Sequence, residues 1–218
     1  MNMFKKNLLV VAATLVAGNS FAAASDVAIT EWMYKGGVGE FIEFTNIGTT
    51  AIDFTGWSYD DDSRKAGTFS LSGFGIVAAG ESVIITETWD NVFRDDWGLD
   101  ASVKVLGNYS NNIGNGDEIN IYDASGSLVD RLTYGSNPRT DGTSGRATSA
   151  DALGANDVSK WVFSTVGDVE GSWRAASGTV GSPGQTSFVS SVPEPESYAL
   201  MLGGLALVGA IARRRVAR

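Results

Sequence analysis

Carboxylates are the main candidates for catalysis or metal binding in this chain, because it lacks the imidazole and thiol groups that usually share those roles. The 218 residues include no histidine and no cysteine. These absences exclude a Ser-His-Asp triad, a histidine general base, a thiolate nucleophile, a disulfide and a metal site built on sulfur or imidazole. Twenty-five Asp and Glu residues remain, and they leave little room for an enzyme.

Two groups of carboxylates have a spacing that fits a function. Asp60, Asp61 and Asp62 form an acidic run, and hard oxygen ligands suit Ca²⁺. The run does not follow the spacing of an EF-hand loop, so a solvated turn is the competing interpretation. Glu31 and Glu43 could form the pair of acids that a glycosidase needs. The sequence cannot select one pair among so many acids, and we expect both side chains to face solvent from their strands.

The first 24 residues have the order of a signal peptide. Lys5 and Lys6 precede an apolar run over 8–17, and small residues then give an A-x-A cleavage site. We expect passage through the Sec translocon and cleavage by signal peptidase after Ala24, with Ala22 as the alternative. An anchor helix is the competing interpretation, but the run is short for a membrane span.

The last segment, 190–218, combines three features in a fixed order. These are the motif Val192-Pro193-Glu194-Pro195, an apolar run over 198–212, and the basic cluster Arg213, Arg214 and Arg215. As a helix the run is about 22 Å long, which is short against a hydrocarbon core of ~30 Å, although flanking residues and snorkelling arginines help it to span. The positive-inside rule keeps the arginines cytoplasmic, where they stop transfer.

This ending resembles the PEP-CTERM sorting signal of Gram-negative bacteria. In that family an exosortase, which is a membrane protease, recognises the Pro-Glu-Pro motif and removes the helix. The resemblance implies a chain that is exported, held transiently in the inner membrane, and then placed at the cell surface or in an extracellular matrix. It implies exosortase as a partner and exopolysaccharide as a second one. A simple tail anchor is the alternative.

Charge in the part between these ends argues against a nucleic-acid partner. Residues 25–192 contain 10 Lys and Arg against 23 Asp and Glu, for a net charge of −13. A surface this acidic repels nucleic-acid backbones and anionic lipids. The sequence has no Gly-Lys-[Ser/Thr] phosphate loop, and its one Gly-x-Gly-x-x-Ala stretch, at 73–78, lacks the flanking strand and helix of a dinucleotide site.

The body, 25–189, predicts many short strands and no sustained helical periodicity. Runs rich in β-branched and aromatic residues alternate with turn residues. We expect strands over 27–34, 40–46, 52–59, 68–71, 82–87, 103–106, 118–122, 128–134 and 160–164. The pair 118–122 and 128–134 is expected to form a hairpin, and 136–158 a long surface loop. The expected core comprises Ile42, Phe44, Phe54, Trp57, Val83, Ile85, Ile119 and Ile121.

The order of motifs in the body resembles a bacterial lamin-tail domain. The matching stretches are ITEWMY at 29–34, EFIEFTNIG at 40–48, IDFTGWSYD at 52–60, GDEI at 116–119, DASGSLVD at 123–130 and SPG at 182–184. The resemblance implies an all-β fold, an immunoglobulin-like β-sandwich, flanked here by the signal peptide and the C-terminal membrane helix. Residues 93–109 have no counterpart and predict an insertion. The resemblance implies an interaction role more than a reaction.

Together these features predict a non-catalytic exported module with a structural or binding role and no cofactor. One alternative is a Ca²⁺-dependent carbohydrate-binding module that uses the acidic run together with exposed aromatic residues. The aromatic candidates for it are Trp89, Trp97 and Tyr109. A carboxylate-dependent hydrolase is a further and less favoured alternative.

Overall fold

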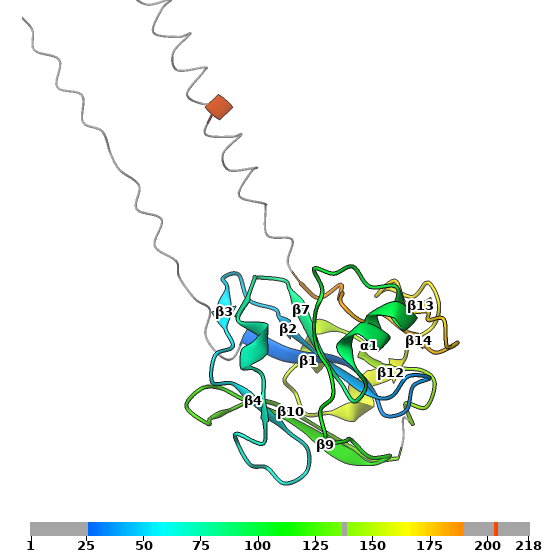
Figure 1. Ribbon diagram of the computed structural model, residues 1–218, viewed down its shortest axis with the longest axis horizontal. Helices are drawn as coiled ribbons and strands as arrows, with labels where there is room; N and C mark the ends of the chain where they lie inside the picture. The colour runs from blue at the N-terminus through cyan, green and yellow to red at the C-terminus, as the bar shows by residue number, and fades with distance from the viewer. Residues whose placement is uncertain (1–25, 137–138, 190–202, 205–218) are drawn as a thin grey trace, which may run out of the picture.

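Two β-sheets packed face to face form the body of the protein in the computed structural model (Figure 1). The structure describes residues 26–136, 139–189 and 203–204. The expected signal peptide with Ala22 and Ala24, the motif 192–195 and the arginines 213–215 lie outside these residues. Of the expected membrane helix 198–212, residues 203–204 are described, and they are helical. Among the described residues, no helix has the length and apolar character needed to cross a membrane.

The larger sheet has six strands in the order β12-β11-β1-β2-β7-β8. Its members are β1 (Val27–Met33), β2 (Phe41–Asn46), β7 (Ser82–Thr86), β8 (Lys104–Leu106), β11 (Gly145–Ala147) and β12 (Trp161–Phe163). The neighbours pair antiparallel except for β7 and β8, which run parallel. A late segment, β11, therefore pairs with the first strand, and the sheet is complete only with residues from both ends of the body.

The smaller sheet has four strands in the order β10-β9-β4-β5. They are β4 (Ser58–Asp60), β5 (Phe69–Ser70), β9 (Asp117–Tyr122) and β10 (Leu128–Tyr134). The expected hairpin over 118–122 and 128–134 is confirmed, since β9 and β10 pair antiparallel. Two minor sheets join β3 (Ile52–Asp53) to β6 (Ile76–Val77) and β13 (Trp173–Arg174) to β14 (Val180–Gly181).

The single strand expected over 52–59 is wrong, because the chain turns within it. Gly56 has a φ of +82°, a conformation that glycine adopts without the strain a side chain would bring. The turn separates β3 from β4 and sends them into different sheets. Within the part of the chain that the structure describes, the short 3₁₀ helices η2 (Ser72–Phe74), η3 (Ala150–Ala152) and η4 (Val158–Lys160) complete the connections.

The core between the two sheets contains every residue that the sequence predicted for it. Ile42, Phe44, Phe54, Trp57, Val83, Ile85, Ile119 and Ile121 are all buried in one cluster. Aromatic rings join the sheets, with Phe44 and Tyr59 centred 6.4 Å apart. Each side chain of this size that leaves water contributes about 1.5–3 kcal/mol, so this layer is the main source of stability.

The outer face of the six-stranded sheet is also covered, which explains the weak alternation in the first strands. Every residue of β1 and β2 is buried. Helix α1 (Asp90–Trp97) packs Phe93 and Trp97 against Phe41 on this face. The cluster comprises Met33, Phe41, Ile84, Phe93, Trp97, Val105 and Ala175. A sheet with two buried faces reads as a continuous apolar run, not as an alternation.

Helix α1 and strand β11 were not predicted, and the expectation of a long loop over 136–158 is wrong in part. Helix α1 has eight residues, too few to show a helical period, and it lies in the segment expected to be an insertion. Strand β11 reads Gly-Arg-Ala, a composition with little strand preference. Its pairing with β1 and β12 holds it in the sheet despite this weak strand preference.

Gly145 provides a test of this packing, because it lies against the indole ring of Trp32. A β-carbon there would be 2.5 Å from the indole ring. We expect Gly145→Ala to lower the free energy of unfolding by about 1–3 kcal/mol, the usual cost of overpacking a core, as measured by urea unfolding. Gly135→Ala is the matched control, since a methyl there meets no described atom within 4 Å. Equal effects of the two substitutions would contradict this account of β11.

Candidate functional site

The outer face of the six-stranded sheet carries a buried pair of carboxylates. Glu31 on β1 and Glu43 on β2 are directly opposite each other, and they are 2% and 0% exposed. A register shift between Ile29 and Glu31 inserts an extra residue, as in a β-bulge, so that Thr30 and Glu31 both point outward. The expectation that Glu31 and Glu43 face solvent is therefore wrong: they point away from the inter-sheet core, but another segment covers them.

The covering segment is the C-terminal strap, residues 180–189. Its turn Ser182-Pro183-Gly184 donates two backbone N–H groups to the pair: Ser182 to Glu31 Oε1 at 2.8 Å, and Gly184 to Glu43 Oε2 at 2.6 Å. A third carboxylate, Glu170, accepts the backbone N–H of Ser187 at 2.6 Å and its hydroxyl at 2.7 Å. Glu31 and Glu43 thus fix the strap to the sheet, and Glu170 fixes its far part to the loop that follows β12.

Hydroxyl groups satisfy the remaining oxygens of the pair. Thr30 Oγ1 donates to Glu43 Oε1 at 2.6 Å, and Thr45 Oγ1 links Thr30 to Ser82 through contacts of 2.8 and 2.7 Å. On the other side, the Ser182 hydroxyl donates to Glu31 Oε2 at 3.2 Å. Ser144 donates to Glu31 Oε1 and lies 2.7 Å from the hydroxyl of Ser164. Buried carboxylates need such partners, because an unsatisfied acceptor in the interior is costly.

Burial also changes the protonation of these acids. Desolvation raises the pKa of Glu31 to about 7, although the hydrogen bonds from Ser144 and Ser182 oppose the change. Desolvation, followed by repulsion from Glu31, raises the pKa of Glu43 well above its usual range. Two carboxylates this close do not both ionise readily, so the pair retains a proton near neutral pH. Its oxygens hold hydroxyls and the strap, and the arrangement suits fastening better than acid–base catalysis.

A third buried acid, Glu40, fastens a different loop. It is 3% exposed, and its Oε1 accepts the Tyr109 hydroxyl and the Ile113 backbone N–H, both at 2.7 Å. Desolvation raises the pKa of Glu40 to about 8. The contacts tie the segment after β8 to the start of β2, and so hold the connection between the two sheets.

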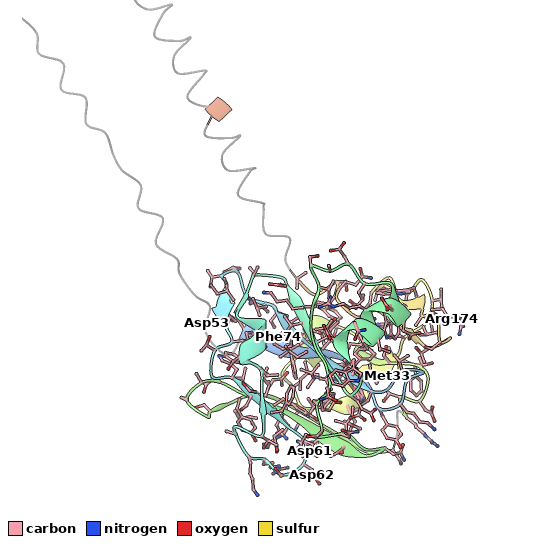
Figure 2. All side chains as sticks on the ribbon, viewed as in Figure 1. Met33, Asp53, Asp61, Asp62, Phe74 and Arg174 are labelled. Carbon is pink, nitrogen blue, oxygen red and sulfur yellow. The ribbon has the colours of Figure 1, made fainter. Side chains whose placement is uncertain are left out.

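The acidic run is split between the interior and the surface. Asp60 is buried and accepts the Ser63 hydroxyl at 2.8 Å and the Lys65 backbone N–H at 3.0 Å. Asp61 and Asp62 lie together at the edge of the body (Figure 2). Within the described ranges, no group of three or more His, Cys, Asp or Glu residues is arranged to hold a metal ion. A calcium role for Asp60, Asp61 and Asp62 stays a prediction.

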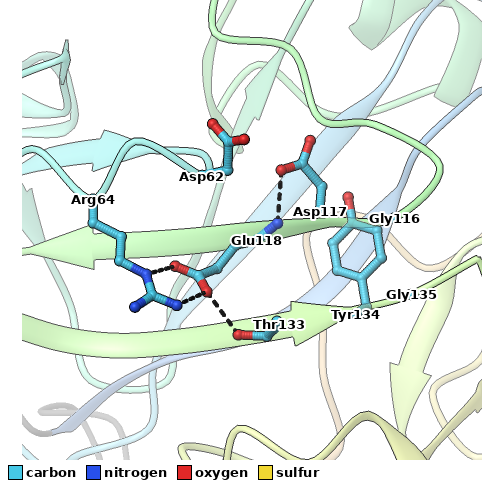
Figure 3. Close-up of a pocket in the computed structure, with 8 residues that line it drawn as sticks. All are labelled: Asp62, Arg64, Gly116, Asp117, Glu118, Thr133, Tyr134 and Gly135. Atoms are coloured by element: carbon cyan, nitrogen blue, oxygen red, sulfur yellow. Dashed lines mark hydrogen bonds and ion pairs between the residues drawn. The ribbon is translucent and has the colours of Figure 1, made fainter.

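An open hollow of about 430 Å³ lies beside this run (Figure 3). Its lining comprises Asp62, Arg64, Gly116, Asp117, Glu118, Thr133, Tyr134 and Gly135. Arg64 makes two hydrogen bonds of 2.8 Å to Glu118, and Thr133 donates to Glu118 Oε2 at 2.8 Å. The Arg64 hydrogen bonds are the main reason why the pKa of Glu118 falls to about 2. A carboxylate held this way stays ionised and paired, which suits fastening of the loop.

The three aromatic candidates separate in the structure. Trp89 is 62% exposed, as the carbohydrate hypothesis requires. Trp97 and Tyr109 are buried, at 4% and 2%, so their expected exposure is wrong. Trp97 packs on Phe41 under α1, and Tyr109 lies in the inter-sheet core.

Sequence reasoning missed the role of Glu40 and Glu170 and the destination of the strap. The turn at 182–184 was recognised, but its partner Glu31 is 151 residues away, a separation that no local pattern reports. One local signal was available for the burial of Glu43. It lies between apolar residues in β2, and a strand that is buried on both faces also buries its acid.

Comparison with known families gives two matches. The family model for the Lamin Tail Domain matches residues 20–136. The model for the PEP-CTERM protein-sorting motif matches residues 191–215. Both resemblances drawn from the motifs are thereby confirmed. Neither the curated proteins nor the solved structures contain a match to this chain.

The buried acids predict that stability falls as pH rises. Their folded pKa values lie above the ordinary value of 4.5, near 7 for Glu31 and near 8 for Glu40, so the folded state binds more protons than the unfolded state across that window. The free energy of unfolding therefore decreases between about pH 5 and pH 8. Each acid that is protonated in the folded state but ionised in the unfolded state lowers the free energy of unfolding by up to about 1.4 kcal/mol per pH unit. Urea unfolding at the two pH values measures this change.

Glu43→Gln should make the free energy of unfolding depend less steeply on pH, because the amide does not titrate and does not repel the ionised form of Glu31. Glu118→Gln is the matched control: Glu118 has a pKa of about 2 and is ionised throughout the window, so this variant should be less stable at both pH values with the slope unchanged. A wild-type protein that gains stability toward pH 8 would refute the argument.

Proposed function

The chain belongs to the lamin tail domain family, and from that premise we propose that it is an exported, non-catalytic protein of the cell surface or extracellular matrix. Its role is structural or binding. Export proceeds through the Sec translocon, and signal peptidase removes residues 1–24. The two packed sheets support an immunoglobulin-like sandwich as the exported body.

The observation that carries this proposal is the position of the strap relative to the sorting motif. The hydrogen bonds that hold the strap to the rest of the body involve residues up to Ser187, and the motif match begins at residue 191. Removal of the chain from residue 191 onward would take away none of these bonds. The folded body and the segment that an exosortase would recognise are therefore adjacent but separable.

The sorting segment supplies the transient membrane stage. Residues 198–212 would form the membrane helix and the arginines 213–215 would stop transfer, as the positive-inside rule describes. Exosortase would then cut at the Pro-Glu-Pro motif and release the body to the surface, with exopolysaccharide as the surrounding material.

The non-catalytic part of the proposal rests on the residue types that are missing and on how the buried carboxylates are engaged. The chain has no histidine and no cysteine. Among the described residues, Glu31, Glu43 and Glu118 are each engaged by several donors of the protein itself. A screen of the purified protein on glycans and nucleic acids should show no turnover. Hydrolysis that Glu31→Gln abolishes would establish the hydrolase alternative instead.

Replacement of both Pro193 and Pro195 by alanine tests the sorting step. We expect the full-length chain to accumulate in the inner membrane, because the exosortase motif is lost while the apolar run 198–212 remains. Fractionation and immunoblotting of cells that carry an exosortase measure the shift in size and location.

Pro138→Ala is the matched control, since it removes a proline outside the motif and should leave processing unchanged. Normal processing and surface delivery of the double variant would refute the proposed sorting.

A further inference from the structure

Trp89 is the one tryptophan that the body leaves at its surface. Of the six, which all lie among the described residues, Trp32, Trp57, Trp97 and Trp161 are buried and Trp173 is half-buried, whereas Trp89 is 62% exposed. It lines a hollow of about 400 Å³ together with Val38, Gly39, Glu87 and Thr88. A large ring that contributes little to the core, and that instead lines a concavity with polar neighbours, is a typical ligand contact.

The backbone beneath this ring is firmly held. The carbonyl of Thr88 accepts the backbone N–H of Asn108 at 2.7 Å. The carbonyl of Trp89 accepts that of Phe93 at 3.0 Å, within the first turn of α1. Gly107 packs so closely that a β-carbon on it would lie 2.3 Å from the backbone nitrogen of Asp90. A contact surface that is already rigid binds with a smaller loss of conformational entropy.

The chemistry of the hollow fits a sugar ring. The apolar C–H face of a pyranose can stack on the flat face of an indole, while the indole N–H stays in water. Glu87 and Thr88 line the hollow with Trp89. Glu87 Oε2 accepts the backbone N–H of Glu40 at 3.3 Å, and carboxylate and hydroxyl oxygens of these residue types can also accept hydrogen bonds from sugar hydroxyls. Glu87 lines the hollow and Asp90 follows Trp89 in the sequence, on a body of net charge −13. This charge disfavours polysaccharides rich in uronic acid.

The hollow lies at the opposite end of the central strands from the point where the strap ends. Strands β2 and β7 pair from Phe41 with Thr86 at one end to Thr45 with Ser82 at the other. Glu87 directly follows the first end, whereas Val189 packs beside Gly80 at the second. The six residues of β2 separate the two ends by about 20 Å. A body held through its C-terminal side would therefore present the hollow away from the attachment.

We propose that the hollow formed by Val38, Gly39, Glu87, Thr88 and Trp89 binds an uncharged polysaccharide, with the Trp89 ring as the stacking surface and Glu87 and Thr88 as hydrogen-bonding groups. Calcium has no part in this binding. The inference rests on the proposed function, since it names the surface through which an exported body engages its matrix.

Affinity electrophoresis of the full chain in mild detergent tests the proposal. The gels contain a soluble β-glucan, a galactomannan or dextran, with alginate as the polyuronate comparison. We expect retardation in one or more of the three uncharged gels, with and without a calcium chelator, and none in alginate. Trp89→Ala should weaken the apparent affinity by about tenfold, as for a central aromatic contact, and Glu87→Gln by less.

Val169→Ala is the matched control, because Val169 is 70% exposed and lies outside the hollow; it should bind as the wild type does. Trp89→Phe should retain part of the retardation. The proposal is overturned by equal mobility of the wild type in all three uncharged gels, by retardation that Trp89→Ala retains, or by retardation that the chelator removes. Failure here with normal surface delivery would leave the proposed function intact.

Discussion

The fold depends on how the outer face of the six-stranded sheet is covered. A two-layer sandwich needs only one buried face per sheet, but here β1 and β2 are buried on both faces. Helix α1 covers the apolar part through Phe93 and Trp97. The strap covers the polar part, where Glu31 and Glu43 receive its backbone N–H groups. The two coverings are chemically different, and each matches the half of the face on which it lies.

Burying carboxylates in this position has a cost that the surrounding groups offset. Removal of Glu31 and Glu43 from water is unfavourable, and the raised pKa values record that cost. Hydroxyls from Thr30 and Ser144 and the amides of the strap supply the partners that water would have given. The arrangement provides specificity in packing. Apolar residues at these positions could also be buried, but they would not form hydrogen bonds that select the turn at 182–184 as the covering segment.

Features that local sequence determines were predictable, and features that distant segments determine were not. The strand over 128–134, its hairpin with β9 and the eight core residues follow from alternation and turn chemistry, which act within a few residues. The sorting tail likewise follows from a fixed local order and is matched by its family model. Strand β11 and the burial of Glu31 depend on partners more than a hundred residues away. Local patterns carry no information about such contacts, and this is why the sequence alone predicts that Glu31 and Glu43 face solvent.

The late position of the strap in the chain has a consequence for the order of folding. A polypeptide emerges from its amino end, and contacts between distant segments wait for the later one. Strands β11 and β12 and the strap are the final pieces of the body, so β1 lacks its second neighbour and Glu31 and Glu43 keep their water until nearly the whole chain has emerged. The body can therefore reach its final packing only when the residues directly before the sorting motif are available to bond Glu31 and Glu43.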